Sequence, residues 1–197
     1  MSILAKKPDR RSAFPGATVS VARMPLLGGK NAVPVWLWWL GYLLSLVLPL
    51  SALLCLSLGP WSWWQALAWT LPVWLLIAAD SISPPLRHSP PAHLPSWPFD
   101  AILYAHGLLQ PLNILAMALL VSQTQWGSAA QMIDGLANLL AVRILMGTTS
   151  CCAAIAPAHE LIHRRSKWQR LLGRMLLCSV LYDHFAVTHS RLHHRHV

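Results

Sequence analysis

The sequence predicts an all-α, membrane-spanning protein, and two features of its composition carry this prediction. Of the 197 residues, 55% are hydrophobic and 11% are charged, whereas soluble domains carry about 25% charged residues. The apolar residues are also gathered into long runs, which the core of a soluble domain does not require. A surface with so little charge must face something other than water. We expect membrane lipid as one partner of the chain and no nucleic acid.

Four segments are apolar over the length of about 20 residues that a spanning helix needs. A turn at Gly59 and Pro60 separates the first two, and a connection at 122–131 separates the last two. Between the second and the third lies a proline-rich link at 81–100, which cannot be helical throughout because proline removes donors and fixes φ. The predicted spans are residues 35–58, 61–79, 101–121 and 132–158.

The basic residues predict how these spans are oriented. Lysine and arginine occur before the first span, in the link at Arg87 and from Arg164 onward, but not in the two other connections. Cytoplasmic loops are enriched in such residues, so we expect an inner-membrane protein with these three regions in the cytoplasm. An organellar transit peptide is the alternative explanation of the arginine-rich start. The predicted parts are a basic tail (1–32), a four-span domain (33–158) and a histidine-rich segment (159–197).

The histidine-rich segment is expected to contain one further helix, at about 167–187. Its first half is amphipathic, with Arg170 and Arg174 among apolar residues, and its second half is apolar through Leu181. Helices of this kind lie along the membrane interface. We expect this helix to bring the histidines that follow it back toward those that precede it.

Histidines near the end of the sequence form two groups. His159 and His163 are four residues apart, and so are His189 and His193, which His194 follows directly. Residues four apart share one face of a helix, so each pair can present two imidazoles to one metal ion. A simple basic tail would use lysine and arginine instead. We predict a metal site made by these five histidines, and because imidazole suits iron, zinc and copper, the ligands alone leave the metal open.

The first group also matches the HExxH motif of zinc metalloproteases, in which Glu160 would be the general base. That mechanism needs a third ligand downstream, and the only acid after Glu160 is Asp183. It also leaves the second histidine group unexplained. A membrane zinc protease is therefore the lesser alternative.

Three strings place the histidines in a wider pattern: His159-Glu160-Leu161-Ile162-His163-Arg164-Arg165, Leu181-Tyr182-Asp183-His184-Phe185 and His189-Ser190-Arg191-Leu192-His193-His194-Arg195. Together they resemble the membrane-bound alkane 1-monooxygenases, a branch of the histidine-box integral-membrane desaturases and hydroxylases. Asp80 and the proline-rich link after it also resemble the loop that follows this family's second span. Before Asp80 the resemblance is weak.

The resemblance implies a di-iron centre on the cytoplasmic side, which uses O2 and electrons from rubredoxin to hydroxylate the terminal carbon of an alkane. His184 matches a family histidine that is not expected to be a ligand, and no catalytic residue is expected beyond the ligands. A related fatty-acyl desaturase or hydroxylase and an aromatic-methyl monooxygenase are the alternatives. The implied iron ligands are His159, His163, His189, His193 and His194.

The sequence departs from the family's pattern around both histidine groups. Thr188 and Leu192 stand where the family has glutamate and glycine, and losing a carboxylate that orients a ligand weakens a metal site. Pro157, just before the first group, leaves the carbonyl of Ala153 without its helical donor. We therefore expect the last turn of the fourth helix to bend.

The family also has further spans and a third histidine box, whereas this sequence stops at Val197. Five histidines cannot fill two iron sites that each need about three or four protein ligands. We therefore expect either a fragment of a longer protein or a truncated product with an incomplete, inactive site. His106, in the third span, is expected to be a satisfied or interface histidine rather than a ligand.

Overall fold

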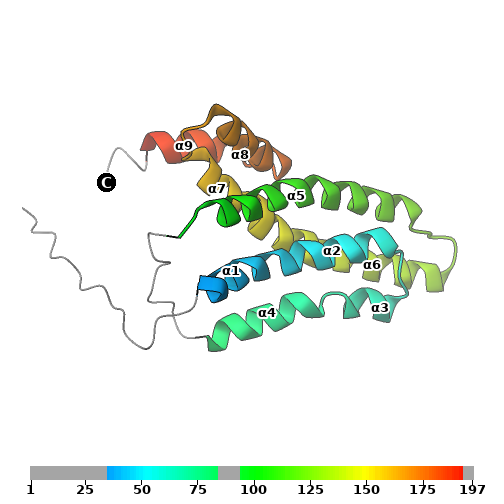
Figure 1. Cartoon of the computed structure of the whole chain (residues 1–197). Coiled ribbons are helices and arrows are strands. Elements are labelled where there is room, and N and C mark those ends of the chain that lie inside the picture. The colour runs from blue at the N-terminus through cyan, green and yellow to red at the C-terminus, as the bar shows by residue number, and fades with distance from the viewer. Residues whose placement is uncertain (1–34, 84–93, 193–197) are drawn as a thin grey trace, which may run out of the picture. The chain divides into compact units, whose positions relative to one another are not determined.

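The computed structural model describes residues 35–83 and 94–192, with side chains described at 37–83 and 94–188. Every regular element in these two ranges is a helix, which confirms the all-α prediction (Figure 1). Four helices are long and apolar enough to cross a membrane, as predicted. Within them only 17% to 33% of each apolar window is buried, so most of their apolar surface is left for lipid. The candidate spans are Leu37–Leu58, Trp63–Ile82, Trp97–Gln123 and Ala129–Ile162.

The first span consists of α1 (Val35–Leu43), a 3-10 turn called η1 (Leu44–Leu46) and α2 (Val47–Leu58). Pro49, in the first turn of α2, has no N–H to donate to the carbonyl four residues earlier, which belongs to Ser45 in the 3-10 turn. α2 packs against α5.

The second span is interrupted, whereas the sequence predicted one continuous helix over 61–79. It consists of α3 (Trp63–Ala68) and α4 (Leu71–Ile82), which a turn at Trp69 and Thr70 separates. Pro72 lies in the first turn of α4, where a missing N–H is tolerated but continuation from α3 is not. The proline therefore explains the break.

The third span, α5 (Trp97–Gln123), begins inside the predicted proline-rich link. Pro98 occupies its first turn, a position that suits proline, so the helix starts four residues earlier than expected. Deeper in the bundle, the buried amide of Asn113 donates to the carbonyl oxygens of Leu109 and Pro49 at 2.9 and 3.0 Å. A hydrogen bond of this kind between spans fixes α5 against α2 where no water is present.

The fourth span runs from α6 (Ala129–Ser150) through a π-helical turn, η2 (Cys151–Ile155), into α7 (Ala156–Ile162). In the π turn, the N–H of Ala156 bonds to the carbonyl of Cys151, five residues earlier. The turn ends two residues before Pro157, close to the place where the sequence predicted a bend. The helix also continues to Ile162, four residues beyond the predicted end.

Polar side chains in the first turns of α6 bind the backbone at the start of α3. Asp134 Oδ1 accepts from the backbone N–H of Trp63 at 2.7 Å, and the Asn138 amide bonds to both the N–H and the carbonyl of Trp61. These bonds satisfy backbone groups at the start of α3 that have no partner within the helix. Asp134 thus has a structural role.

The segment after the fourth span contains two helices, and the prediction of one helix at 167–187 is wrong. α8 (Lys167–Ser179) is followed by a turn, and α9 (His184–Leu192) begins afterwards. The turn holds Leu181 at a φ of 58°, a left-handed conformation that is unfavourable for leucine. The amide of Tyr182 donates to the carbonyl of Leu177 at 2.9 Å and closes the end of α8.

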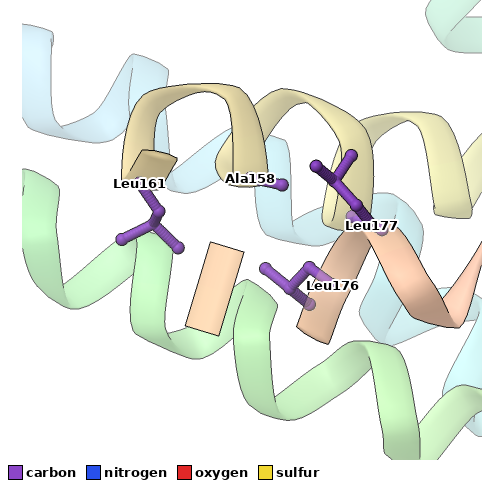
Figure 2. Close-up of a cluster of buried hydrophobic side chains, with 5 residues drawn as sticks. Ala158, Leu161, Leu176 and Leu177 are labelled. Carbon is purple, nitrogen blue, oxygen red and sulfur yellow. The ribbon is translucent and has the colours of Figure 1, made fainter. Parts of the chain in front are cut away.

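α7 and α8 pack against each other through a small apolar core (Figure 2). Figure 2 shows Ala158 and Leu161 of α7 beside Leu176 and Leu177 of α8, and all four residues are buried. The side chain of Phe185, from α9, packs against the same core. This core holds the end of the fourth span to the segment that follows it.

Gly173 makes this close approach possible. A Cβ atom at Gly173 would lie 3.0 Å from Leu161 Cβ and 3.1 Å from the carbonyl oxygen of Ala158. Gly173→Leu is therefore expected to separate α8 from α7 and to destabilise the fold by about 1–3 kcal/mol, the usual effect of overpacking. Gly147→Leu is the matched control, because a Cβ at Gly147 would meet nothing within 4 Å. Thermal unfolding in detergent measures both, and equal stability of the two variants would contradict the prediction.

Candidate metal centre

The first histidine pair lies at the end of α7. His159 is in the last helical turn, and His163 is the residue at which the helix ends. Their ring centroids are 5.0 Å apart at an interplanar angle of 62°. The predicted sharing of one helix face is thus confirmed for this pair, at a separation that suits two imidazoles on one metal ion.

The first turn of α9 contacts this histidine pair. The ring of Phe185 lies 5.7 Å from that of His159, and Tyr182 stacks on Phe185 at 5.4 Å. Phe185 therefore joins the α7–α8 core to the imidazole face. The start of α9 is held beside the first histidine group.

The second histidine group lies largely outside the described residues. The backbone of His189 is in α9, but its side chain is not described, and His193 and His194 fall in the undescribed range 193–197. Among the described residues, no group of three histidine, cysteine, aspartate or glutamate side chains is placed to hold a metal ion. The described pair fits two ligands of such a site and does not complete it, so the five-histidine site stays a prediction.

An ion-pair network ties the first histidine group to the third span. Arg164 Nη2 lies 2.8 Å from Asp100 Oδ1 in α5 and 3.0 Å from Glu160 Oε1 in α7. The guanidinium of Arg170 donates to the carbonyl oxygens of Arg164 and Arg165 at 3.0 and 2.6 Å, beyond the end of α7. Sequence reasoning used these arginines for orientation, for the amphipathic pattern and for the family resemblance, but assigned them no ion-pair partner and missed Asp100. Its one signal was an acid at the edge of an apolar span.

A cavity of about 590 Å³ lies next to this network, on a different side of α7 from the histidine pair. Glu160 and Arg164 line it, and neither His159 nor His163 belongs to its lining. His106 of α5 also lines it, is 3% exposed, and has its Nε2 2.9 Å from Ser45 Oγ. His106 thus has a hydrogen-bond partner at Nε2, whereas its Nδ1 is buried without a partner among the described residues, so the expectation of a satisfied histidine holds for one ring nitrogen only.

A second ion pair closes the turn between α8 and α9. Two nitrogens of the Arg174 guanidinium lie 3.2 and 3.3 Å from the two carboxylate oxygens of Asp183. This hydrogen bonding lowers the pKa of Asp183 below its usual 3.8, and it raises the pKa of Arg174. His184, next in sequence, lies with its ring 4.6 Å from that of Tyr182.

The attachment of α9 is expected to weaken in acid. Because the pKa of Asp183 is lowered in the folded state, its carboxylate stabilises the turn above the usual value of 3.8, and this contribution is lost as the pH falls through the lowered pKa. Both groups are solvent-exposed, so the effect is small and local. Protection factors from hydrogen exchange of the α9 amides should fall below that pH in the wild type. In Asp183→Asn they should be low at every pH, and an unchanged acid response in this variant would contradict the assignment.

The sequence is similar to several alkane 1-monooxygenases, although no family profile matches it. It is 28% identical over 172 residues to alkane 1-monooxygenase 1 of Pseudomonas aeruginosa. This match covers 84% of this chain and 43% of that protein. It is 28% identical over 152 residues to alkane 1-monooxygenase 2 of the same organism, covering 70% of this chain and 39% of the relative. No solved structure matches the chain.

A shorter stretch is more similar. Over 63 residues the chain is 41% identical to alkane 1-monooxygenase 2 of Alcanivorax borkumensis. This stretch covers 32% of this chain and 16% of the relative. The chain spans about two fifths of the length of the Pseudomonas relatives. The four candidate spans indicate a multi-pass membrane protein. Its sequence is similar, at low identity over most of its length, to alkane 1-monooxygenases.

Proposed function

We propose that the chain is part of a di-iron membrane monooxygenase that hydroxylates the terminal carbon of alkanes, using O2 and electrons from a rubredoxin-type donor. The observation that carries the proposal is the histidine pair at the end of the fourth span, with its rings 5.0 Å apart. Similarity to alkane 1-monooxygenases over 84% of the chain supports it independently.

The position of α9 supports the proposal that both histidine groups serve one centre. Phe185 contacts His159, and position 189 follows Phe185 by four residues in the same helix. Residues four apart share a helix face and are about 6 Å apart along its axis. The second histidine group therefore begins about one turn from a residue that contacts the first. The proposed ligands are His159, His163, His189, His193 and His194.

The chain's own residues are proposed to hold and shield the metal. Iron, when bound, supplies the oxygen chemistry, while the protein supplies orientation and a dry pocket. Arg164 fixes the end of α7 to α5 through Asp100, so the histidine pair keeps its place relative to the spans. The ring of Phe185 packs beside that of His159 and would shield this side of the imidazole from water. An apolar substrate reaches such a site from the bilayer.

The proposed orientation follows the basic residues. With the tail, the link and the segment from 159 onward in the cytoplasm, the histidine pair lies at the inner face of the cell membrane, where a soluble electron donor can dock. A fatty-acyl or aromatic-methyl substrate is the alternative within the same chemistry.

Metal content and product formation test the proposal. The full-length protein encoded by the gene, purified in detergent, is expected to carry about two irons per chain. Given rubredoxin and its reductase, it should convert octane to octan-1-ol. The 197-residue chain alone is expected to bind metal poorly and to show no turnover. Bound zinc with peptide cleavage that Glu160→Gln abolishes would overturn the proposal in favour of the protease.

A further inference from the structure

Ser45 presents a hydrogen-bond acceptor, and no donor, to the cavity that Glu160, Arg164 and His106 line. Its hydroxyl donates to the carbonyl oxygen of Tyr42 at 2.6 Å, and its Oγ is 2.9 Å from His106 Nε2. A serine hydroxyl has one proton and two lone pairs. Because a carbonyl can only accept, that proton is used on Tyr42, and His106 must be the donor in the second bond.

This pairing fixes the tautomer of His106 and leaves one lone pair on Ser45. If Ser45 donates to Tyr42, His106 carries its proton on Nε2, and its Nδ1 is left buried without a partner among the described residues. The ring is 3% exposed, so it is held in place by its surroundings. Ser45 itself is exposed and lines the cavity. Its remaining lone pair is available to a molecule that can donate a hydrogen bond.

The rest of the cavity suits an aliphatic chain. Three apolar side chains of α5, those of Phe99, Ile102 and Leu103, also line it. The ring of Tyr42 lies edge-on to that of Phe99, with centroids 4.8 Å apart. The volume of about 590 Å³ lies within the range of about 300–1,000 Å³ that is usual for small-molecule sites.

We propose that this cavity binds an aliphatic primary alcohol, whose hydroxyl donates to Ser45 Oγ and whose chain lies along α5. An alkane would leave the Ser45 lone pair without a partner, and an ether brings a second acceptor. A primary alcohol is the product of the proposed hydroxylation. The interpretation of the cavity as a product site therefore rests on the proposed function. The binding itself does not require metal or turnover.

Two isomers of equal size distinguish a donor from an acceptor: octan-1-ol and 1-methoxyheptane. Binding is followed by NMR of the His106 side chain in protein labelled with ¹⁵N-histidine, in detergent. The wild type is expected to bind the alcohol about tenfold more tightly than the ether, as one additional hydrogen bond gives. Equal affinities would overturn the proposal, and they would also indicate that water alone occupies the Ser45 lone pair.

Ser45→Ala and Ser51→Ala provide a matched pair of variants. Ser51 lies in the same span and donates to the carbonyl oxygen of Leu48, three residues earlier, but it does not line the cavity. Ser45→Ala should remove the preference for the alcohol, whereas Ser51→Ala should keep it. Each ligand partitions into the detergent to the same extent whichever variant is present, so this partition cancels when the variants are compared. A preference that survives Ser45→Ala would overturn the assignment.

The same spectra report the tautomer of His106. Protonation at Nε2 in the wild type is expected, and protonation at Nδ1 would overturn the hydrogen-bond assignment even if the variants did not fold. Absence of alkane oxidation with a retained alcohol preference would contradict only the proposed function. Normal oxidation with equal alcohol and ether affinity would contradict only this inference.

Discussion

Alanine at His159 or His163 is expected to abolish iron retention and to reduce alkane hydroxylation in the full-length protein by more than 100-fold. Losing only the hydrogen-bond partner of a metal ligand typically costs about 10- to 100-fold, and here a proposed ligand itself is removed. His159 is half-buried and His163 is exposed, so neither truncation opens a large cavity. Metal analysis and rubredoxin-coupled product formation measure the effect.

His184→Ala is the matched control for these variants. His184 belongs to the same histidine-rich segment but is exposed and packs on Tyr182 rather than on the histidine pair. It should retain iron and activity. Equal loss in all three variants would show that the segment responds to any histidine replacement, and full iron content in His163→Ala would contradict the ligand assignment.

Leu161→Ala is expected to have the largest effect on stability. The side chain is fully buried against Leu176 and Leu177, in the core that joins α7 to α8. Truncating a buried leucine destabilises a protein by about 2–5 kcal/mol, because transfer energy is lost and a cavity remains. Since Leu161 lies between His159 and His163 in sequence, loosening α8 should also disorder the metal site. Thermal unfolding and hydrogen exchange of the α8 amides measure both consequences.

Two variants show whether the effect comes from packing. Leu161→Met conserves volume and is expected to cost less than about 1.5 kcal/mol. Met175→Ala removes a side chain of similar size from the exposed side of α8, where it is 59% exposed, and should change stability little. If Met175→Ala destabilised the protein as much as Leu161→Ala, the core in Figure 2 would not be what holds these helices together.

The long helices could be predicted from sequence because their signal is local. Apolar length alone identified all four spans, and the four-residue spacing of His159 and His163 placed both rings on one face. The break in the second span had a signal too: Pro72 in the first turn of α4. Sequence reasoning did not weigh that proline because the predicted span, 61–79, was mostly apolar.

Other features depend on partners that are distant in sequence. The ion pair between Asp100 and Arg164 joins residues 64 positions apart, and no periodicity predicts it. The turn between α8 and α9 was missed because the apolar run continues through Leu181, which the structure nevertheless holds in a left-handed conformation. The cavity at Ser45 likewise exists only once the first span, α5 and the end of the fourth span lie together.

The π turn before the histidine pair has a consequence for how the chain tolerates changes in length. A π turn contains one residue more than the regular helix that it interrupts. Removing one residue from Cys151–Ile155 therefore restores an α-helix and leaves the direction of α7 nearly as it was. Removing two would turn α7 by about 100° about its axis and carry both imidazoles away from Phe185. At this one place in the fourth span, homologous sequences can differ by a single-residue gap and still aim the same two rings at the same neighbour.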